Sequence, residues 1–362
     1  MRFVPSHCIT AGMKLGDPLY NDRGDLMLSK GQILTDEYIS AIHRLQYNGI
    51  YIDDDLSKDL EIINVINDKV RSQTIKTIKN TFIQFEQHDP ERKPSDSIRK
   101  NMEQMKRQVQ SIVDEICKKK DVMVNMIDMK VFDDYTYFHS VNVAVLSIVL
   151  GVAMDLERKD LNNLGFSALL HDIGKVFVRK DLLNKTEKLT FEEFEELKMH
   201  SKLGYGYIKS GMGVSNIVHM GILDHHEKYG GGGYPNNLNG DRISLFGRII
   251  AVADVYDALT SDRPYRKAIL PSNAVEYIMG SVVTRFDPEV VKVFVRKIAP
   301  YPIGTCVKLS NGSKGIVIDN YEEFPMRPRL RIYEEKGKVL KEPYELMLAD
   351  KNRLNITVVE IV

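Results

Sequence analysis

The stretch Ala168-Leu169-Leu170-His171-Asp172-Ile173-Gly174-Lys175 places an imidazole and a carboxylate side by side at the end of an apolar segment. We expect the apolar residues to form a helix that stops at Gly174, since glycine readily adopts the left-handed backbone that ends many helices. Adjacent residues do not share a helix face, but at a helix end His171 and Asp172 can converge on one point. A ring nitrogen can then bind one metal ion while the carboxylate reaches a second. By itself such a dipeptide is weak evidence, because most His-Asp pairs at helix ends bind no metal. The case for a metal site, with Lys175 just behind it, therefore depends on residues elsewhere in the chain.

Composition limits the classes of protein to which the chain can belong. Its 362 residues, 43% of them hydrophobic, suffice for about two to four domains with substantial cores. The formal net charge is zero, so there is no general electrostatic case for binding a nucleic acid polymer or an anionic membrane. Any phosphate-binding ability must therefore be local.

Cysteine usage and hydropathy favour a cytoplasmic protein. Cys8, Cys117 and Cys306 are far apart and form no CxxC pair, which is typical of a reducing compartment. Residues 1–20 lack the basic and apolar regions of a leader peptide. The longest apolar run, Val141 to Met154, is too short to span a bilayer, so we expect a buried core helix and no membrane insertion.

The two flanks of the chain differ from its centre. Residues 1–55 combine a hairpin signal, a helix that begins after Thr35 and a short strand, which predicts a small α+β module. Residues 56–124 predict a helical linker pair broken by the prolines of segment 89–96; its second helix has an almost heptad apolar rhythm. This pair could pack on the rest of the chain or on its copy in a homodimer, and of the two we favour the homodimer. Residues 300–362 alternate with turn signals, which predicts a small β-barrel-like or curled-sheet module.

The intervening segment 125–299 reads as almost wholly helical and concentrates metal-ligand residue types. Singly, each histidine would more often be a core or surface residue. Asp254, however, lies in an otherwise apolar helix, where an unpaired buried charge is costly and a metal is a natural partner. His200 is expected on the polar side of the helix that contains Phe194. The candidate ligands are His139, His171, Asp172, His200, His225, His226 and Asp254.

Together these motifs resemble a known family. His171-Asp172, with a preceding helical histidine and a late aspartate, resembles the HD superfamily of metal-dependent phosphohydrolases. Asp224-His225-His226-Glu227, Gly232-Gly233-Tyr234-Pro235 and the run from Asp254 to Arg266 narrow the resemblance to the HD-GYP family, bacterial phosphodiesterases that degrade cyclic di-GMP. The resemblance covers roughly residues 125–297. It implies a multidomain, mainly α protein whose all-α HD-GYP bundle is flanked by the two small modules.

The resemblance also implies roles for individual residues. The seven candidates would hold a binuclear centre, with Asp172 bridging and catalytic. Lys175 would contact the scissile phosphate, and Gly233, Tyr234 and Pro235 would shape the substrate loop. Arg263 and Arg266 would grip phosphate oxygens, because a guanidinium presents its donors in a fixed fork. Two such metals would acidify a bridging water to hydroxide for in-line attack. The mixed ligands suit iron or manganese, without excluding zinc, cobalt or nickel.

One position departs from the family pattern. Some members place a glutamate one turn before the first histidine and use it to hold a third metal, but here that position is Tyr135. Tyrosine is a poor replacement, so we predict two metals, although Asp134 could reach in.

The expected activity is hydrolysis of cyclic di-GMP to linear pGpG, with continuation to GMP left open. One alternative is a related cyclic dinucleotide such as cyclic GMP-AMP, which the same phosphate clamp would hold. Another is a catalytically silent cyclic di-GMP receptor that signals through the helical pair. Retention of every ligand and of Lys175 argues against a silent site.

Overall fold

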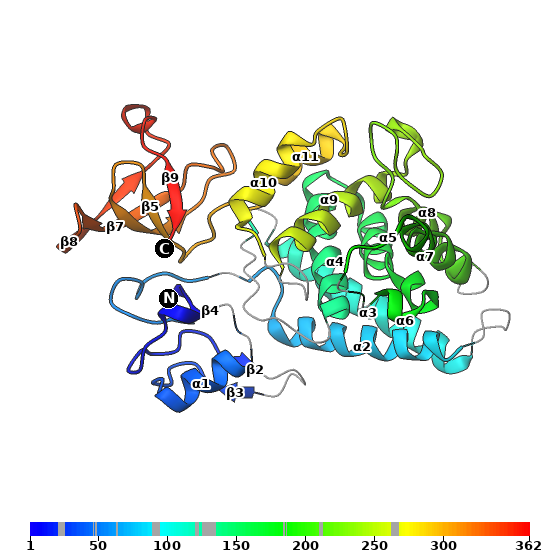
Figure 1. Ribbon diagram of the computed structural model, residues 1–362, viewed down its shortest axis with the longest axis horizontal. Helices are drawn as coiled ribbons and strands as arrows, with labels where there is room; N and C mark the ends of the chain where they lie inside the picture. Colours follow the sequence, from blue (N-terminus) through cyan, green and yellow to red (C-terminus); the bar gives the residue numbers. More distant parts are fainter. Residues whose placement is uncertain are drawn as a thin grey trace.

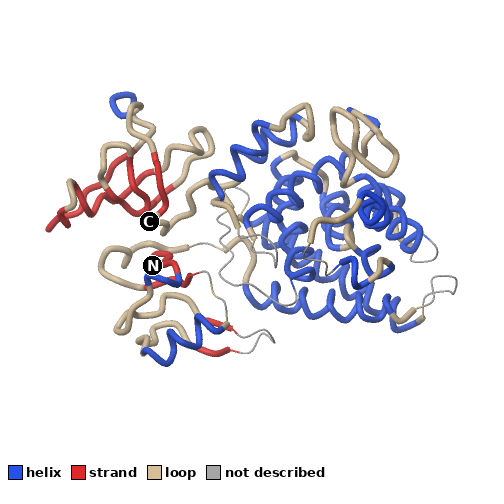
Figure 2. The backbone as a smooth tube through the Cα atoms, viewed as in Figure 1, coloured by secondary structure: helices blue, strands red, loops and turns tan. Residues whose placement is uncertain are grey.

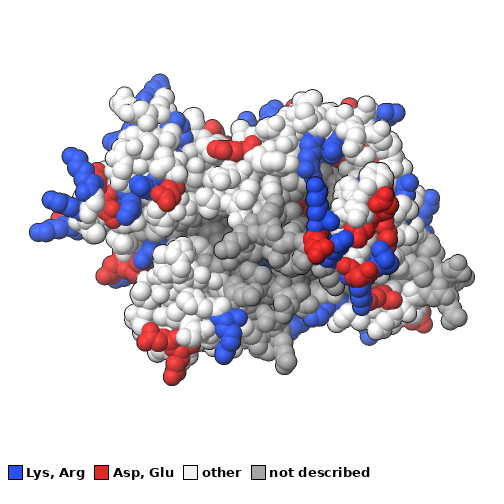
Figure 3. All heavy atoms as spheres, in the orientation of Figure 1, with Lys and Arg blue, Asp and Glu red and all other residues white. Residues whose placement is uncertain are grey.

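In the computed structural model, most helices form one body, and the strands gather beside it together with one short helix near the N-terminus (Figures 1 and 2). The two chain ends lie close together. Basic and acidic side chains are interspersed on the face drawn in Figure 3, in keeping with the zero net charge. The structure describes residues 1–20, 26–45, 47, 49–62, 64–88, 95–119, 123–124, 135–183, 185, 187–209, 213–261 and 268–362.

The helical body has one hydrophobic core, which extends along the chain from Val65 to Ile298. Two of its apolar helices, α4 and α9, are buried in it and carry His139 and Asp254. By length and composition, α4 is the one helix in the described part of the chain that could cross a membrane, and most of it is buried among other helices. The elements of the body are α2 (Asp68–Glu86), α3 (Asp96–Lys118), α4 (Tyr135–Ala153), α5 (Arg158–Leu169), η2 (Ile173–Phe177), α6 (Lys180–Leu183), α7 (Phe191–Lys209), α8 (Asn216–Asp224), η3 (Gly240–Arg242), α9 (Leu245–Thr260), α10 (Pro271–Gly280) and α11 (Pro288–Lys297).

Helices α2 and α3 form the expected helical pair, which packs on α4 and α5 within the same chain. All six apolar residues of the heptad rhythm of α3 are buried there, so this face packs within the chain and not, as we favoured, against a second copy. They are Ile98, Met102, Met105, Val109, Ile112 and Ile116. The first helix does not extend back to Leu56, as its apolar residues suggested. It begins at Asp68, because the Asn67 side chain caps it by accepting from Val70 N–H at 2.9 Å.

The N-terminal segment has the α+β content that its sequence predicts. Strand β1 (Arg2–Pro5) leads through η1 (Ser6–Cys8) and pairs antiparallel with β4 (Gly49–Ile52). Strands β2 (Leu19–Tyr20) and β3 (Leu26–Leu28) form a hairpin, whose turn lies outside the described residues. Helix α1 (Asp36–Arg44) begins after Thr35, whose side chain accepts from Tyr38 N–H, so the predicted cap is confirmed.

The C-terminal segment forms one antiparallel five-stranded sheet in the order β8-β7-β6-β5-β9. It is an open sheet, with β8 and β9 at its edges, and not a closed barrel. Its elements are β5 (Cys306–Leu309), β6 (Lys314–Asp319), β7 (Arg329–Glu335), β8 (Lys338–Met347), η4 (Lys351–Arg353) and β9 (Val358–Ile361).

The two flanks contact each other. The Phe3 amide donates to the carbonyl of Gly304 at 3.0 Å. On β7, Arg331 forms a forked pair with Asp59 at 2.6 and 2.7 Å, and also donates to the carbonyl of Leu56 at 3.0 Å. The segment that leads into α2 is therefore held by the C-terminal sheet.

Candidate metal centre

His171 and Asp172 lie in the short connection between α5 and η2, and both are buried. The helix ends at Leu169, before the pair. Gly174 does not take the left-handed conformation that we expected, because it is part of η2 and has no positive φ. It is required for close packing instead: a Cβ there would collide with the carbonyl oxygen of His200 and lie 2.6 Å from the Gly204 nitrogen.

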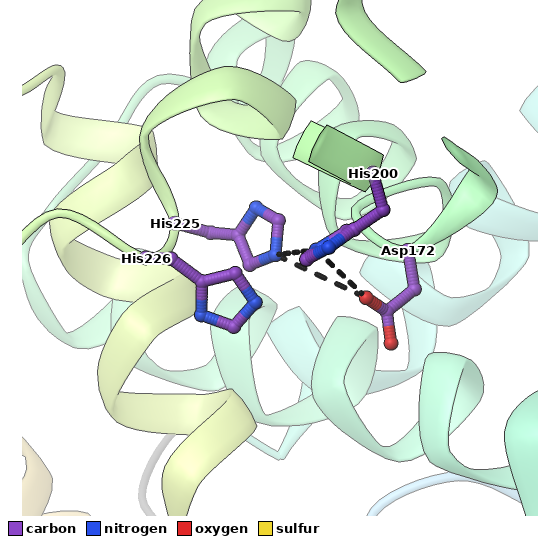
Figure 4. A group of neighbouring side chains, drawn as sticks. All are labelled: Asp172, His200, His225 and His226. Carbon is purple, nitrogen blue, oxygen red and sulfur yellow. Dashed lines mark hydrogen bonds and ion pairs between the residues drawn. The ribbon is translucent and has the colours of Figure 1, made fainter. Parts of the chain in front are cut away.

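The structure brings the seven predicted ligands together in two groups, and within each group the ligand atoms lie within 4.8 Å of one another. One group contains Asp172, His200, His225 and His226, drawn in Figure 4, and the other contains His139, His171 and Asp254. Their role as ligands stays a prediction.

Asp172 lies between the two groups and faces each with a different oxygen. Its Oδ1 is 3.4 Å from His200 Nε2 and 4.0 Å from His225 Nε2; both contacts are dashed in Figure 4, as is the 3.4 Å contact between the two Nε2 atoms. Its Oδ2 is 3.4 Å from His171 Nε2 and 3.9 Å from His139 Nε2. A carboxylate in this position can bridge two metal ions.

Backbone carbonyls determine which ring nitrogen faces the centre. The Nδ1 atoms of His171, His200 and His225 lie 2.7–2.8 Å from the carbonyl three residues earlier in each case. A carbonyl can only accept, so each Nδ1 carries the hydrogen and each Nε2 keeps its lone pair. Such contacts commonly orient metal-binding histidines. His139 is oriented differently, because its Nδ1 lies 2.6 Å from Asp257 Oδ2.

Two buried polar atoms show that the site fits a metal. His171 Nε2 and Asp172 Oδ1 have no hydrogen-bond partner among the described residues. Buried polar atoms without partners are rare because they lose the hydration they had in water. A divalent cation would satisfy both, and imidazole with carboxylate is a common donor set for first-row transition metals. The described residues thus include a buried histidine and aspartate cluster able to hold metal.

The electrostatics of the cluster keep most ligands in their metal-binding forms. Burial lowers the pKa of His200 and of His225, and it lowers that of His226 to about 3. Burial opposes the charge of Asp172, but Lys175 and His171 hold its pKa well below the usual range. At neutral pH these imidazoles are therefore neutral and this carboxylate is ionised, as metal binding requires.

His139 behaves differently from the other histidines. Burial opposes its charged form, but hydrogen bonds with Asp254 and Asp257 raise the pKa of His139 to about 9. The same contact with His139 keeps the pKa of Asp254 well below its usual range, although burial acts against it. The metal-free His139 therefore forms an ion pair with Asp254, with Nε2 and Oδ1 3.2 Å apart.

The predicted substrate residues lie beside this cluster where the structure describes them. Lys175 Nζ is 2.5 Å from Asp172 Oδ2. The Tyr234 ring lies 4.7 Å from that of His226, and its amide donates to the His226 carbonyl at 3.3 Å. Pro235 follows in the same loop. Arg263, Arg266 and Asp134 lie outside the described residues, as does the side chain of Tyr135.

Gly233 and Glu227 hold this loop in place. A Cβ at position 233 would collide with the Lys228 nitrogen, so the loop can approach the backbone only with glycine there. The buried Glu227 carboxylate accepts from the amides of Asn236 at 2.6 Å and Leu238 at 3.0 Å.

Helix α7 buries the face opposite to the one that its apolar residues predicted. We expected His200 on the polar side, but it is buried, whereas Phe191 and Phe194 are 73% and 44% exposed. The reason is that α7 packs against η2 and α8 through the side that carries His200. The Phe194 ring is 6.4 Å from Tyr234, and Lys198 Nζ lies 5.0 Å and 5.7 Å from the two ring centres. An aromatic and cationic rim thus adjoins the cluster.

Sequence reasoning missed Asp257 and Asn142, which support His139. Asp257 Oδ1 accepts from Asn142 Nδ2 at 2.9 Å, while its other oxygen contacts His139. A signal was available: Asp257 is three residues after Asp254 and Asn142 three after His139, a spacing that shares a helix face. Glu227 was part of a recognised motif, but no role was assigned to it.

Comparison with known families identifies the helical part. Residues 96–290 match the HD domain, and residues 306–360 match a KOW domain associated with the HD domain. The chain belongs to the HD domain family. The resemblance stated from the motifs is thereby confirmed.

Three similar proteins illustrate the family. This HD-domain chain is 38% identical, over 59% of its own length and 51% of the relative's, to cyclic di-GMP phosphodiesterase PA4108 of Pseudomonas aeruginosa. It is 37% identical to 3'3'-cGAMP-specific phosphodiesterase 3 of Vibrio cholerae, over 43% and 34% of the two chains. A solved structure, the HDG"Y"P protein Bd1817 from Bdellovibrio bacteriovorus, superimposes with a TM-score of 0.48 at 16% identity, over 80% of this chain and 97% of that one. The matched part of the chain spans about half or less of the length of the two phosphodiesterases from Pseudomonas aeruginosa and Vibrio cholerae.

Proposed function

We propose that this HD-domain protein is a metal-dependent phosphodiesterase that opens cyclic di-GMP to linear pGpG and can continue to GMP. The observation that carries the proposal is the position of Asp172, which presents one carboxylate oxygen to each of two buried ligand groups. The name of the 38% identical relative supports the choice of substrate.

The proposed metal ligands are the seven clustered residues, His139, His171, Asp172, His200, His225, His226 and Asp254, and iron or manganese is the expected metal. A bound metal pair supplies Lewis acidity and lowers the pKa of water, as in other two-metal phosphodiesterases. Asp172 would contribute one carboxylate oxygen to the metal ion of each group. The carbonyl contacts of His171, His200 and His225 keep their Nε2 atoms directed inward before metal arrives.

Lys175 is the proposed phosphate contact. Its ammonium adjoins Asp172 and is about one-third exposed, so it can meet both the ligand cluster and an incoming phosphate. There it would stabilise the negative charge that develops on the phosphate oxygens. Gly233, Tyr234 and Pro235 shape the loop beside the substrate, and Arg263 with Arg266 remains the proposed phosphate clamp. Two metals remain the proposed number.

A second candidate substrate is cyclic GMP-AMP. The observation that favours it is the 37% identity to a relative named for that dinucleotide. Phosphate contacts would be common to both substrates, so discrimination must come from groups that touch the bases. A silent cyclic di-GMP receptor is less favoured, because it would not need a complete ligand set with Lys175 beside it.

The cysteines bear on the cellular location of the protein, and the packing of α3 bears on its assembly. We propose a cytoplasmic location, since the cysteines that the structure describes are free. A homodimer could not use the apolar face of α3, which is buried within the chain. A homodimer through the helical pair would therefore use the outer face of the pair.

The test is hydrolysis by full-length protein with the Asp172→Asn variant as its matched partner. The variant keeps the side-chain shape but loses the charge that bridges the two groups. We expect pGpG from the wild type, and from the variant at least about 100-fold less, together with loss of metal. If the wild-type protein still hydrolysed cyclic di-GMP at its full rate after a chelator had removed the metal, the proposal would be contradicted.

A further inference from the structure

We propose that Arg71 of helix α2 is a positioning residue of the metal centre, acting on His139 through Asn142 and Asp257. Arg71 precedes residues 96–290, which match the HD domain. The inference rests on the proposed metal-binding role of His139, and it adds to the centre a residue from a neighbouring helix.

The four side chains form a continuous line of hydrogen bonds from α2 to the cluster. The Arg71 guanidinium donates to Asn142 Oδ1 at 2.7 Å. Asn142 Nδ2 donates to Asp257 Oδ1 at 2.9 Å, and Asp257 Oδ2 lies 2.6 Å from His139 Nδ1. The line joins three helices, since Arg71 is on α2, Asn142 and His139 are on α4, and Asp257 is on α9.

Only one orientation of the Asn142 side-chain amide suits both of its neighbours, Arg71 and Asp257. A guanidinium has only donors, so Asn142 must turn its oxygen to Arg71, which directs its nitrogen to the Asp257 carboxyl oxygen. Reversing the amide would place donor against donor and acceptor against acceptor. Arg71 therefore determines how Asn142 meets Asp257, and Asp257 in turn orients the His139 ring.

Burial makes this line effective. Asn142, Asp257 and His139 are 3%, 1% and 3% exposed, within helices whose other residues are mostly apolar. In such surroundings each hydrogen bond polarises the next, and misplacing one member costs more than it would in water. Arg71 supplies a charged donor at the outer end, where the line meets α2.

The position of Arg71 links the metal centre to the flanks of the chain. It lies in the first turn of α2, just after the segment that Arg331 holds through Asp59 and Leu56. Figure 1 shows α2 running along one side of the helical body, from the flanking modules outward. Any displacement of α2 by those modules would change the support of His139.

The test uses full-length protein reconstituted with Co²⁺, whose visible absorption spectrum reports ligand geometry. Arg71→Met removes the donors but keeps an unbranched chain, whereas Arg71→Lys keeps one cationic donor. Lys76→Met is the control, because it removes an exposed cation from the same helix. The readouts are the cobalt spectrum, the rate of cobalt loss to a chelator and the thermal midpoint of the metal-free protein.

We expect Arg71→Met to alter the cobalt spectrum and to speed cobalt loss by roughly tenfold, the lower end for residues that support metal ligands. Arg71→Lys should fall between Arg71→Met and wild type, and Lys76→Met should match wild type. A wild-type spectrum and rate in Arg71→Met would overturn the role of Arg71 alone. If Arg71→Met does not fold, a wild-type spectrum and rate in Arg71→Lys would do the same. Failure of the wild type itself to bind cobalt would overturn the proposed metal centre.

Discussion

Gly174 and His200 are in such close backbone contact that any side chain at position 174 would collide with the carbonyl oxygen of His200. This contact sets η2 against α7 and so brings Asp172 next to the His200 ring, with Oδ1 and Nε2 3.4 Å apart. The glycine of the His-Asp motif therefore acts on the metal site through packing.

Gly174→Ala should separate η2 from α7. The added Cβ would collide with backbone atoms of α7, which cannot move aside as a flexible side chain could. We therefore expect a loss of stability of about 3 kcal/mol and weaker metal binding. Gly206→Ala, also on α7, is the control, since a Cβ there meets nothing within 4 Å. Urea unfolding and metal titration measure both effects. Wild-type metal affinity in Gly174→Ala would show that this contact does not position the ligands.

Glu227→Gln should loosen the loop that carries Tyr234. The ionised carboxylate accepts from two loop amides, and a glutamine can offer only one oxygen. We expect KM for cyclic di-GMP to rise by roughly tenfold, with metal content unchanged. Glu192→Gln, an exposed carboxylate on α7, should behave as wild type. A fall in metal content, with KM unaltered, would place Glu227 in support of the ligands instead.

Phe194→Ala should weaken binding of the substrate bases. Phe194 lies beside Tyr234 at the rim of the site, and stacking of a base on an aromatic ring contributes roughly 1–3 kcal/mol. We expect KM to rise by about tenfold with little change in kcat. Phe191→Ala removes a more exposed ring from the same helix and should change little. If Phe194→Ala had the same KM as Phe191→Ala and the wild type, Phe194 would be excluded from substrate binding.

Asp59→Asn should weaken the contact between the C-terminal sheet and the segment before α2. The hydrogen bonds from Arg331 lower the pKa of Asp59 to about 2, from an ordinary value of 3.8. The folded state thus favours the ionised form, and its stabilisation is present above about pH 4 and lost as the pH falls toward 2.

Since the Asp59 side chain is 66% exposed, we expect the Asn variant to melt only about 2 °C below wild type at pH 7. The difference should shrink as the pH approaches 2. Asp55→Asn, an exposed neighbour, is the control. A difference that is the same at both pH values would show that ionisation of Asp59 is not involved.

Residue chemistry and local spacing predicted much of the molecule. The heptad rhythm of α3 correctly indicated a buried face, and the apolar surroundings of Asp254 correctly indicated a buried carboxylate. His171 and Asp172 were expected together at the end of an apolar helix, and both are buried directly after α5. These features depend on residues that are neighbours along one element.

Features that depend on packing between elements were not predicted. His200 was expected on the polar side of its helix, because Phe191 and Phe194 have the residue type of a core, yet α7 packs through the other side. The role of Gly174 depends on the backbone of a helix that follows much later in the chain. Arg71 meets Asn142 only because α2 lies on α4, and no local pattern marks that contact.

The most direct measurement is hydrolysis of cyclic di-GMP by anaerobically purified full-length protein, with the metal content determined on the same sample. We expect pGpG as product and about two iron or manganese ions per chain. Three tightly held ions would contradict the binuclear assignment. Full metal occupancy without hydrolysis of cyclic di-GMP would contradict the proposed activity.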